Sequence, residues 1–189
     1  MRAASALLIL ALAAVLASPA GAAEEKKAKP PKPAAHPATG APSEALGTAD
    51  SWSAYTYKQK GGRVCYVIAQ PEKTAPADAK RRQPMAMVTH RPEEKSFNVV
   101  SFNEGYPLKE GSDVTVDIGG SKYTLFTRGD SAWAATSELD KTIVEALAKG
   151  KRAVVIGTSQ RGRTTTDTYA LSGFSKALGL IDGACGVKR

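Results

Sequence analysis

Short runs of alternating apolar and polar residues dominate the chain from about residue 48 onward. The clearest is Asp113–Ile118, where a valine or isoleucine occupies every second position, the period of a strand with one buried face. Similar strands are expected at residues 51–57, 63–69, 84–90, 96–102, 122–127, 152–157 and 164–170, with a short extended piece at 132–135. This pattern predicts a mainly β fold, either a β-sandwich or a partly open barrel of six to eight short strands.

Two segments instead show the helical period, and we expect them to pack at the edge of the strands. The first runs from Ser137 to Lys149, with apolar residues on one face, acidic residues in its first turn and Gly150 at its end. The second contains Phe174, Ala177, Leu178 and Ile181 on one face. Its expected N-cap is Ser172, and its expected stop is Gly183.

The first 23 residues read as a signal peptide. Arg2 precedes an apolar run of about 11 residues, and small residues then offer cleavage sites between Ala20 and Ala23. An uncleaved membrane anchor is the alternative, but a spanning helix needs about 20 apolar residues. We therefore expect a mature protein outside the cytoplasm, with no transmembrane anchor after cleavage.

Residues 24–47 are rich in proline, lysine and alanine, and Leu46 is their only large aliphatic residue. Such a segment cannot bury a core, so we predict a disordered, partly polyproline tether. The tether either reaches across the cell wall space or binds an anionic surface, or it is a solvated leader with no partner, and composition favours the leader. Residues 48–189 have a globular composition and suit a single β-rich domain.

The chain is basic, with 26 Lys and Arg against 18 Asp and Glu. Such a balance attracts nucleic acid, anionic lipid or an acidic envelope polymer. Export and the lack of aromatic residues among the basic loops argue against nucleic acid. A solvated surface is the simpler interpretation, and an anionic envelope or host-surface partner is the functional one. The candidate patch for that partner consists of Lys80, Arg81, Arg82, Lys151, Arg152, Arg161 and Arg163.

Catalytic chemistry is poorly represented. His90 is the only histidine of the predicted domain, and we interpret it as structural or surface-exposed rather than as a base. A catalytic triad needs a nucleophile, a nearby base and an orienting acid, and His90 is the sole candidate base. Two cysteines and one histidine are too few ligands for a zinc site. The sequence contains no phosphate-binding glycine motif. We therefore predict no enzyme, no metal and no cofactor. Paired carboxylates brought together by the fold would leave a hydrolase of an envelope polymer as an alternative.

A second alternative is adhesion through the tripeptide Arg128–Asp130, which has the sequence that integrins recognise. A turn at a strand end uses glycine and aspartate for its own geometry, so the tripeptide is weak evidence. Adhesion requires that Asp130 lie at an exposed tip.

The two cysteines, Cys65 and Cys185, lie near opposite ends of the predicted domain. If both thiols are oxidised, the bond closes nearly the whole domain, and a loop of about 100 residues is worth roughly 4.7 kcal/mol on the chain-entropy model.

The leader, a first strand containing tryptophan, the run Arg63–Gln70 and the terminal Tyr169–Leu178 with Ala184 and Cys185 resemble the invasion-associated locus B family of exported bacterial proteins. The resemblance implies a mainly β, non-enzymatic, periplasmic or surface domain. It also implies that Cys65 and Cys185 form a disulfide. Many relatives carry further cysteines in the middle of the domain, and this chain has none there.

The sequence thus predicts a periplasmic or cell-envelope protein that acts as a binding or structural module. The resemblance adds a role in host-cell invasion or in survival of envelope stress.

Overall fold

The computed structural model describes residues 43–77 and 80–189. Its strands are β1 (Glu44–Ala49), β2 (Trp52–Gln59), β3 (Gly62–Ala69), β4 (Lys73–Ala75), β5 (Met85–Arg91), β6 (Ser96–Asn103), β7 (Asp113–Ile118), β8 (Ser121–Arg128), β9 (Ser131–Trp133), β10 (Arg152–Thr158) and β11 (Thr164–Ala170). Its helices are the short 3-10 helix η1 (Pro92–Glu94) and the α-helices α1 (Ser137–Lys149) and α2 (Phe174–Cys185). The predicted signal peptide and most of the predicted tether lie outside the described residues.

All described strands belong to one antiparallel sheet with the order β1-β2-β3-β5-β6-β9-β8-β7-β10-β11-β4. The mainly β class is confirmed, but six to eight strands is too few, because the sheet has eleven. Its edges are β1 and β4, so the sheet is open, and neither the predicted sandwich nor the predicted partly open barrel is confirmed. The additional strands are short or poor in apolar residues, which is why the hydrophobic pattern does not reveal them.

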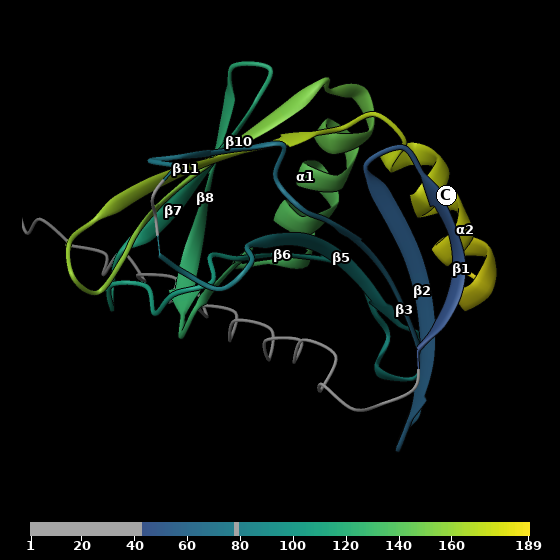
Figure 1. The fold of residues 1–189 in the computed structure, drawn as a ribbon. Helices are drawn as coiled ribbons and strands as arrows, with labels where there is room; N and C mark the ends of the chain where they lie inside the picture. The colour runs from purple at the N-terminus through teal and green to yellow at the C-terminus, as the bar shows by residue number, and fades with distance from the viewer. Residues whose placement is uncertain (1–42, 78–79) are drawn as a thin grey trace, which may run out of the picture.

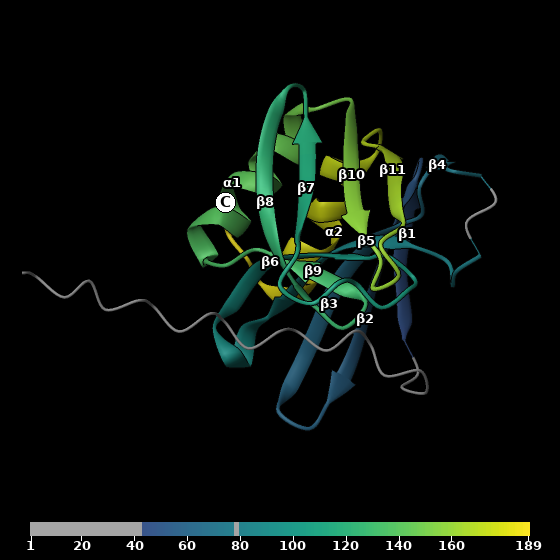
Figure 2. The ribbon, with the colours of Figure 1, turned by 90° about the vertical axis from the view of Figure 1, so that its left-hand side faces the viewer.

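The sheet bends sharply, so that the strands around β7 and β10 stand at a steep angle to β1, β2 and β3 (Figure 1). Strands β8, β7, β10 and β11 lie side by side, with α1 and α2 behind them (Figure 2). Both helices pack on the same face of the sheet, since their buried residues join one core with residues from β2 through β11. Neither α-helix of the described residues packs on the opposite face of the sheet.

Strand β1 begins at Glu44, so residues 44–47 belong to the sheet. The sequence pattern had predicted that they belong to the tether. This segment has few apolar residues to bury. The backbone hydrogen bonds of its pairing with β2 hold it in the sheet. The correction moves the start of the domain at least four residues toward the N-terminus.

Helix α1 has the predicted bounds, and the Thr136 hydroxyl caps it by accepting a hydrogen bond from the Leu139 amide at 3.2 Å. Both predicted ends of α2 are wrong. Its N-cap is Gly173, which has φ +85°, and a side chain there would clash with the Ala49 carbonyl. Ser172 instead donates to Asp50, and α2 continues through Gly183 to Cys185, where Gly186 closes it.

Trp52 connects the start of β2 to the far end of the sheet and to α2. Its indole N–H donates to the Ala170 carbonyl at 2.9 Å, and its ring meets Phe174 edge-on with centroids 4.8 Å apart. Both aromatic side chains are fully buried. The contact therefore places the first turn of α2 against β2 and fixes how the helix crosses the sheet.

Candidate functional site: a basic pocket above a buried ionic cluster

Three loops enclose a cavity of about 590 Å³, which we call the basic pocket. One loop precedes β5, one follows β6, and one joins β10 to β11. The residues that line the pocket are Lys80, Arg81, Gly105, Tyr106, Pro107, Ser159, Gln160, Arg161, Arg163 and Thr165. Four of these ten residues are cationic, and none of the described lining residues is acidic.

Backbone contacts hold the first two loops together. The Arg82 amide donates to the Gly105 carbonyl at 3.0 Å. Gly105 has φ +72°, and a β-carbon at this position would lie 2.0 Å from the Arg82 carbonyl oxygen. Only glycine permits so close an approach. The position of the pocket wall therefore depends on this residue.

The third loop is a tight turn between β10 and β11. The Ser159 amide donates to the Arg163 carbonyl at 2.8 Å, and the Gln160 amide donates to the Pro107 carbonyl at 2.9 Å. The second bond joins this turn to the loop that follows β6. As a result, Arg161 and Arg163 are held beside Lys80, although some 80 residues separate them in the chain.

Beneath the pocket, Arg81 forms a buried ionic cluster with two carboxylates. Its side chain is 3% exposed, and those of Glu104 and Asp167 are fully buried. The guanidinium donates to the Glu104 carbonyl at 2.8 Å, lies 3.4 Å from Glu104 Oε2 and donates to Asp167 Oδ1. The hydroxyl of Thr74 also donates to Asp167, at 2.8 Å. Because two carboxylates share one cation, the cluster is neutral only if it also holds a proton.

The surroundings of Glu104 favour that proton. Burial, together with the negative charge of Asp167, raises the pKa of Glu104 to about 7, although Arg81 opposes both effects. Glu104 Oε1 and Asp167 Oδ2 have no hydrogen-bond partner among the described residues. A proton shared between the two carboxyl groups would satisfy both oxygens, as in other close carboxylate pairs.

Tyr106 links the cluster to the pocket. The Arg81 guanidinium lies 5.4 Å from the centre of its ring, and its hydroxyl forms a 2.6 Å hydrogen bond with Thr165. Burial is the main reason that the pKa of Tyr106 rises to about 12, so its hydroxyl stays neutral at physiological pH. The ring thus gives the basic pocket an apolar wall of fixed orientation.

The structure divides the predicted anionic-partner patch. It brings Lys80, Arg81, Arg161 and Arg163 to the basic pocket, although Arg81 is buried and ion-paired rather than free on the surface, which corrects that part of the prediction. Arg82 pairs with Asp130, and Arg152 pairs with Glu72 at 3.0 Å.

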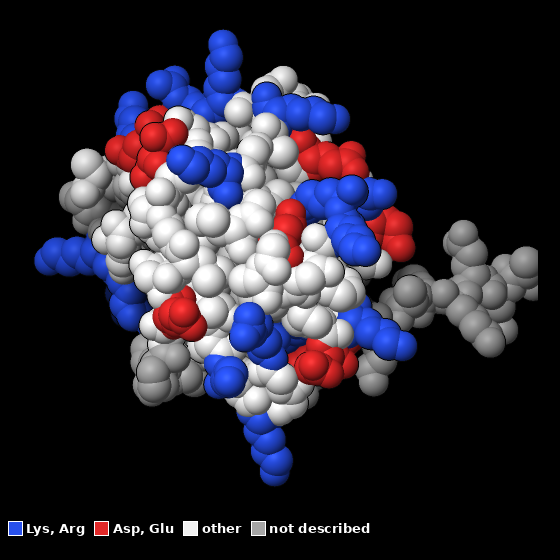
Figure 3. All heavy atoms as spheres, turned by 90° about the vertical axis from the view of Figure 1, so that its right-hand side faces the viewer, with Lys and Arg blue, Asp and Glu red and all other residues white. Residues whose placement is uncertain are grey.

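Lys151 and Arg152 lie at the start of β10, and the pocket loop follows its end. Seven strand residues span about 23 Å, so these two cations belong to another part of the surface. The face of the molecule in Figure 3 likewise shows Lys and Arg spread among Asp and Glu, with no continuous basic area.

Sequence reasoning missed Glu104, Asp167 and Tyr106. A signal for Asp167 was present, because the alternation in the predicted strand 164–170 places it on the same face as Tyr169, which is buried. An aspartate on the inner face of a strand requires a partner. Glu104 and Tyr106 stand in an irregular segment after β6, where no periodicity indicates which side chains point inward.

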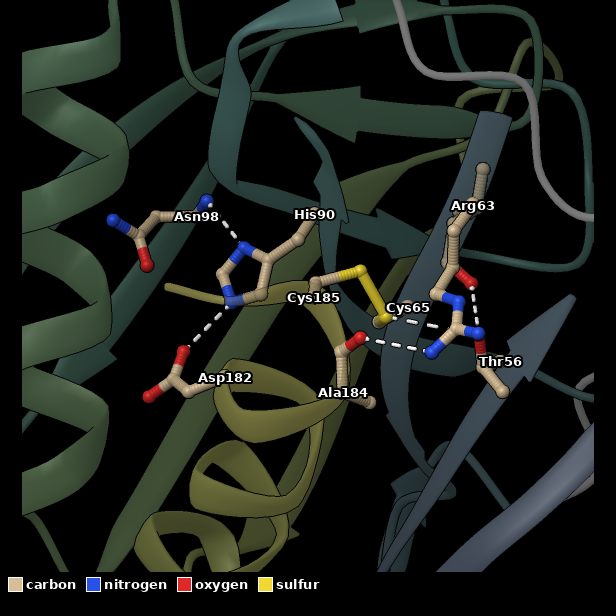
Figure 4. Close-up of a disulfide and its surroundings, with 9 residues drawn as sticks. Thr56, Arg63, Cys65, His90, Asn98, Asp182, Ala184 and Cys185 are labelled. Atoms are coloured by element: carbon tan, nitrogen blue, oxygen red, sulfur yellow. Dashed lines mark hydrogen bonds and ion pairs between the residues drawn. A yellow bond between two sulfur atoms is a disulfide. The ribbon is translucent and has the colours of Figure 1, made fainter. Parts of the chain in front are cut away.

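The disulfide and His90 form a separate structural cluster around the end of α2 (Figure 4). Cys65 and Cys185 are bonded, with α-carbons 6.1 Å apart and a sequence separation of 120, as the resemblance implies. His90 is fully buried, as a structural histidine should be.

The tautomer of His90 follows from its two partners. The backbone N–H of Asn98 donates to His90 Nδ1 at 3.0 Å. The proton of the neutral ring is therefore on Nε2, which donates to Asp182 Oδ1 at 2.9 Å. Arg189 binds the same carboxylate at 2.5 Å. Burial is the main factor that lowers the pKa of His90. The ring therefore stays neutral and holds α2 to β5.

Neither alternative activity gains support from these positions. His90 does not line the basic pocket, and the buried pair Glu104 and Asp167 lies outside its lining. Asp130 is not at a free tip, because its carboxylate binds Arg82 and accepts a hydrogen bond from Ser131 at 2.9 Å.

The described part of the chain contains no group of three or more His, Cys, Asp or Glu side chains placed to hold a metal ion. None of its described helices combines the length and the apolar character that a membrane span requires.

Comparison with known proteins supports a single assignment. The search of curated proteins found no match. The crystal structure of invasion associated protein B from Bartonella henselae has the same fold, with a TM-score of 0.54 and 20% identity over 75% of this chain and 95% of that one. The family model described as invasion associated locus B protein matches residues 52–182. Since this match covers more than half of the chain, the protein belongs to the invasion-associated locus B family.

Proposed function

We propose that the protein is an exported, non-enzymatic envelope protein that binds an anionic carbohydrate polymer in the basic pocket. The signal-peptide pattern of residues 1–23 supports export to the periplasm. The observation that carries the proposal is the convergence of Lys80, Arg161 and Arg163 on one cavity whose described lining residues include no acidic side chain. Several cations in one concave site attract a polyanion more strongly than the same charges spread over a surface.

The rest of the lining suits a sugar chain. Tyr106 and Pro107 offer an apolar wall against which a sugar ring can pack, and Ser159, Gln160 and Thr165 offer hydrogen-bonding groups. Such polymers occur on bacterial envelopes and on host cells, so the same site serves envelope attachment or host contact. The name of the family supports a role in entry into host cells, and survival of envelope stress is the alternative role.

The experiment uses the oxidised mature protein and fluorescently labelled heparin oligosaccharides as the probe. The charge reversal Arg161→Glu with Arg163→Glu should weaken binding at least tenfold at 0.15 M salt, because two contacting cations become repulsive. The matched control is Lys151→Glu with Arg152→Glu, which changes the net charge equally at a distant site and should weaken binding less than threefold.

The salt dependence gives a second measure. The wild type and the control should lose affinity steeply as salt rises, and the pocket variant should show a flatter slope. Equal losses in the two variants would show that net charge, and not the pocket, attracts the polymer, and would contradict the proposal.

A further inference from the structure

The face of the sheet opposite to the α-helices carries a second apolar cluster, on β2, β3 and β5. Tyr55 and Tyr66 are directly opposite each other on β2 and β3, and their rings stack with centroids 5.4 Å apart. Ile68 and Met87 form a cross-strand pair on β3 and β5. Together with Met85, these side chains line a cavity of about 1040 Å³, which we call the tyrosine trough.

Ion pairs within the protein balance the charged residues of the trough, which are Glu72, Arg82 and Asp130. Arg82 pairs with Asp130, and Glu72 pairs with Arg152 at 3.0 Å. The other polar side chains of the lining are uncharged: besides the tyrosine hydroxyls, they are those of Ser43, Ser51, Ser53, Gln70, Gln83 and Asn103. An uncharged ligand therefore complements the trough better than an anion does.

The residue types of the trough suit an uncharged sugar. An aromatic ring packs against the apolar face of a sugar ring, while amides and hydroxyls around it bind the hydroxyl and acetamido groups of the sugar. Tyr55 is half-buried, so part of its side chain is open to a ligand. Gln70 and Gln83 are exposed at the same cavity and offer two amides.

The trough and the basic pocket share one wall. Arg81 lines the pocket and Arg82 lines the trough, and neighbouring α-carbons lie about 3.8 Å apart. On the second segment of the wall, Asn103 lines the trough and Gly105 lines the pocket. The Arg82 amide donates to the Gly105 carbonyl at 3.0 Å, which holds the two segments together. The two cavities are therefore neighbours.

The two neighbouring cavities differ in charge. Lys80, Arg161 and Arg163 converge on the basic pocket and favour acidic groups there. In the trough, an acidic group would meet the carboxylates of Glu72 and Asp130. A polymer that fits both cavities therefore places an uncharged sugar next to an acidic one. Binding at two linked subsites also raises the affinity above that of either alone.

We propose that the tyrosine trough is a second subsite for the polymer that the basic pocket binds, and that it takes an uncharged sugar of that polymer. This inference rests on the proposed function of the basic pocket. It narrows the ligand to acidic polysaccharides in which uncharged sugars alternate with charged ones. Tyr55 and Tyr66 form the platform against which the uncharged sugar packs.

Fluorescently labelled octasaccharides of hyaluronan and of heparin, titrated with the oxidised mature protein, test the subsite. In hyaluronan an uncharged N-acetylated sugar alternates with a uronic acid, whereas both sugars of the heparin repeat carry charge. Tyr55→Ser should weaken hyaluronan binding about tenfold, because the uncharged sugar loses its aromatic platform, and should change heparin binding less than about twofold.

Two further variants control for the substitution itself. Tyr55→Phe keeps the aromatic ring and should retain hyaluronan binding within about twofold. Phe97→Ser removes an exposed aromatic ring outside both cavities and should leave the binding of both polymers unchanged.

Because Tyr55→Ser can fail to fold, Gln70→Ala with Gln83→Ala changes two exposed side chains of the trough instead. This variant should weaken hyaluronan binding about threefold through the loss of two hydrogen-bonding amides and should leave heparin binding unchanged. Unchanged hyaluronan binding in the folded trough variants, or equal losses for the two polymers, would overturn the proposal. A wild-type dimer that Tyr55→Ser dissociates would also overturn it, because a second copy would then occupy the trough.

The pocket variant Arg161→Glu with Arg163→Glu separates this proposal from the proposed function. If it weakens the binding of both polymers while the trough variants have no selective effect, the basic pocket stands and only the subsite is refuted. If it leaves the binding of both polymers unchanged, the basic pocket is not the polymer site and both proposals are refuted.

Discussion

Cys65 and His90 lie directly opposite each other on β3 and β5, and both side chains reach helix α2. Their partners, Cys185 and Asp182, are three residues apart and so occupy the same face of that helix. One covalent bond and one hydrogen bond therefore fasten the last turn of α2 to two neighbouring strands. The arrangement predicts that α2 remains attached to the sheet when either link is removed alone.

Replacement of both cysteines by alanine should lower the free energy of unfolding by about 3–5 kcal/mol, because the bond closes a loop of 120 residues that restricts the unfolded chain. Urea unfolding at pH 7 of the oxidised wild type and of the variant measures the loss. The reduced wild type is the control and should resemble the variant. A loss below about 1 kcal/mol would show that the disulfide contributes little to stability.

The neutral state of His90 predicts a loss of stability in acid. Burial is the main factor that lowers the pKa of His90 in the folded protein. The neutral ring therefore stabilises the folded state above the ordinary pKa of about 6.5. This contribution is lost as the pH falls through the pKa of the folded state. Unfolding free energies of the wild type and His90→Gln between pH 7.5 and 5 test this. The wild type should lose more over this range than the variant, and parallel curves would contradict the assignment.

Asp140 predicts the opposite trend. Burial raises its pKa to about 7 although it accepts a hydrogen bond from the Val100 amide at 2.8 Å. Its stabilising contribution is present below pH 4 and is lost as the pH rises through about 7. Asp140→Asn should therefore gain roughly 3 kcal/mol over the wild type between pH 4 and 8. Glu145→Gln, exposed on the same helix, should show no such gain.

The buried cluster makes Arg81 far more important for stability than its neighbour. Arg81→Met leaves Glu104 and Asp167 buried without a cation, which should cost about 3–5 kcal/mol at pH 8. The cost should be smaller at pH 5, where Glu104 is protonated. Arg82→Met removes an exposed ion pair and should cost below about 1 kcal/mol. Similar losses in the two variants would contradict the role of the cluster.

Local pattern was sufficient for most elements of the fold. The strand Asp113–Ile118 and the helix Ser137–Lys149 have the predicted bounds because their periodicity and caps are encoded within each segment. The ends of α2 could not be predicted in this way. Ser172 is a residue type that often caps helices, but its hydroxyl donates a hydrogen bond to Asp50, which is distant in sequence. Position 173 must be glycine because a side chain there would clash with the Ala49 carbonyl.

The candidate site depended on contacts between distant parts of the chain. The sequence by itself determined that the protein is mainly β, basic and supplied with two cysteines at opposite ends of one domain. Only the tertiary structure decided that Arg81 would be buried against Glu104 and Asp167 while Arg161 and Arg163 stayed at the pocket. The physical reason is that periodicity specifies which residues share a face, whereas the order of strands in the sheet specifies which faces and loops meet.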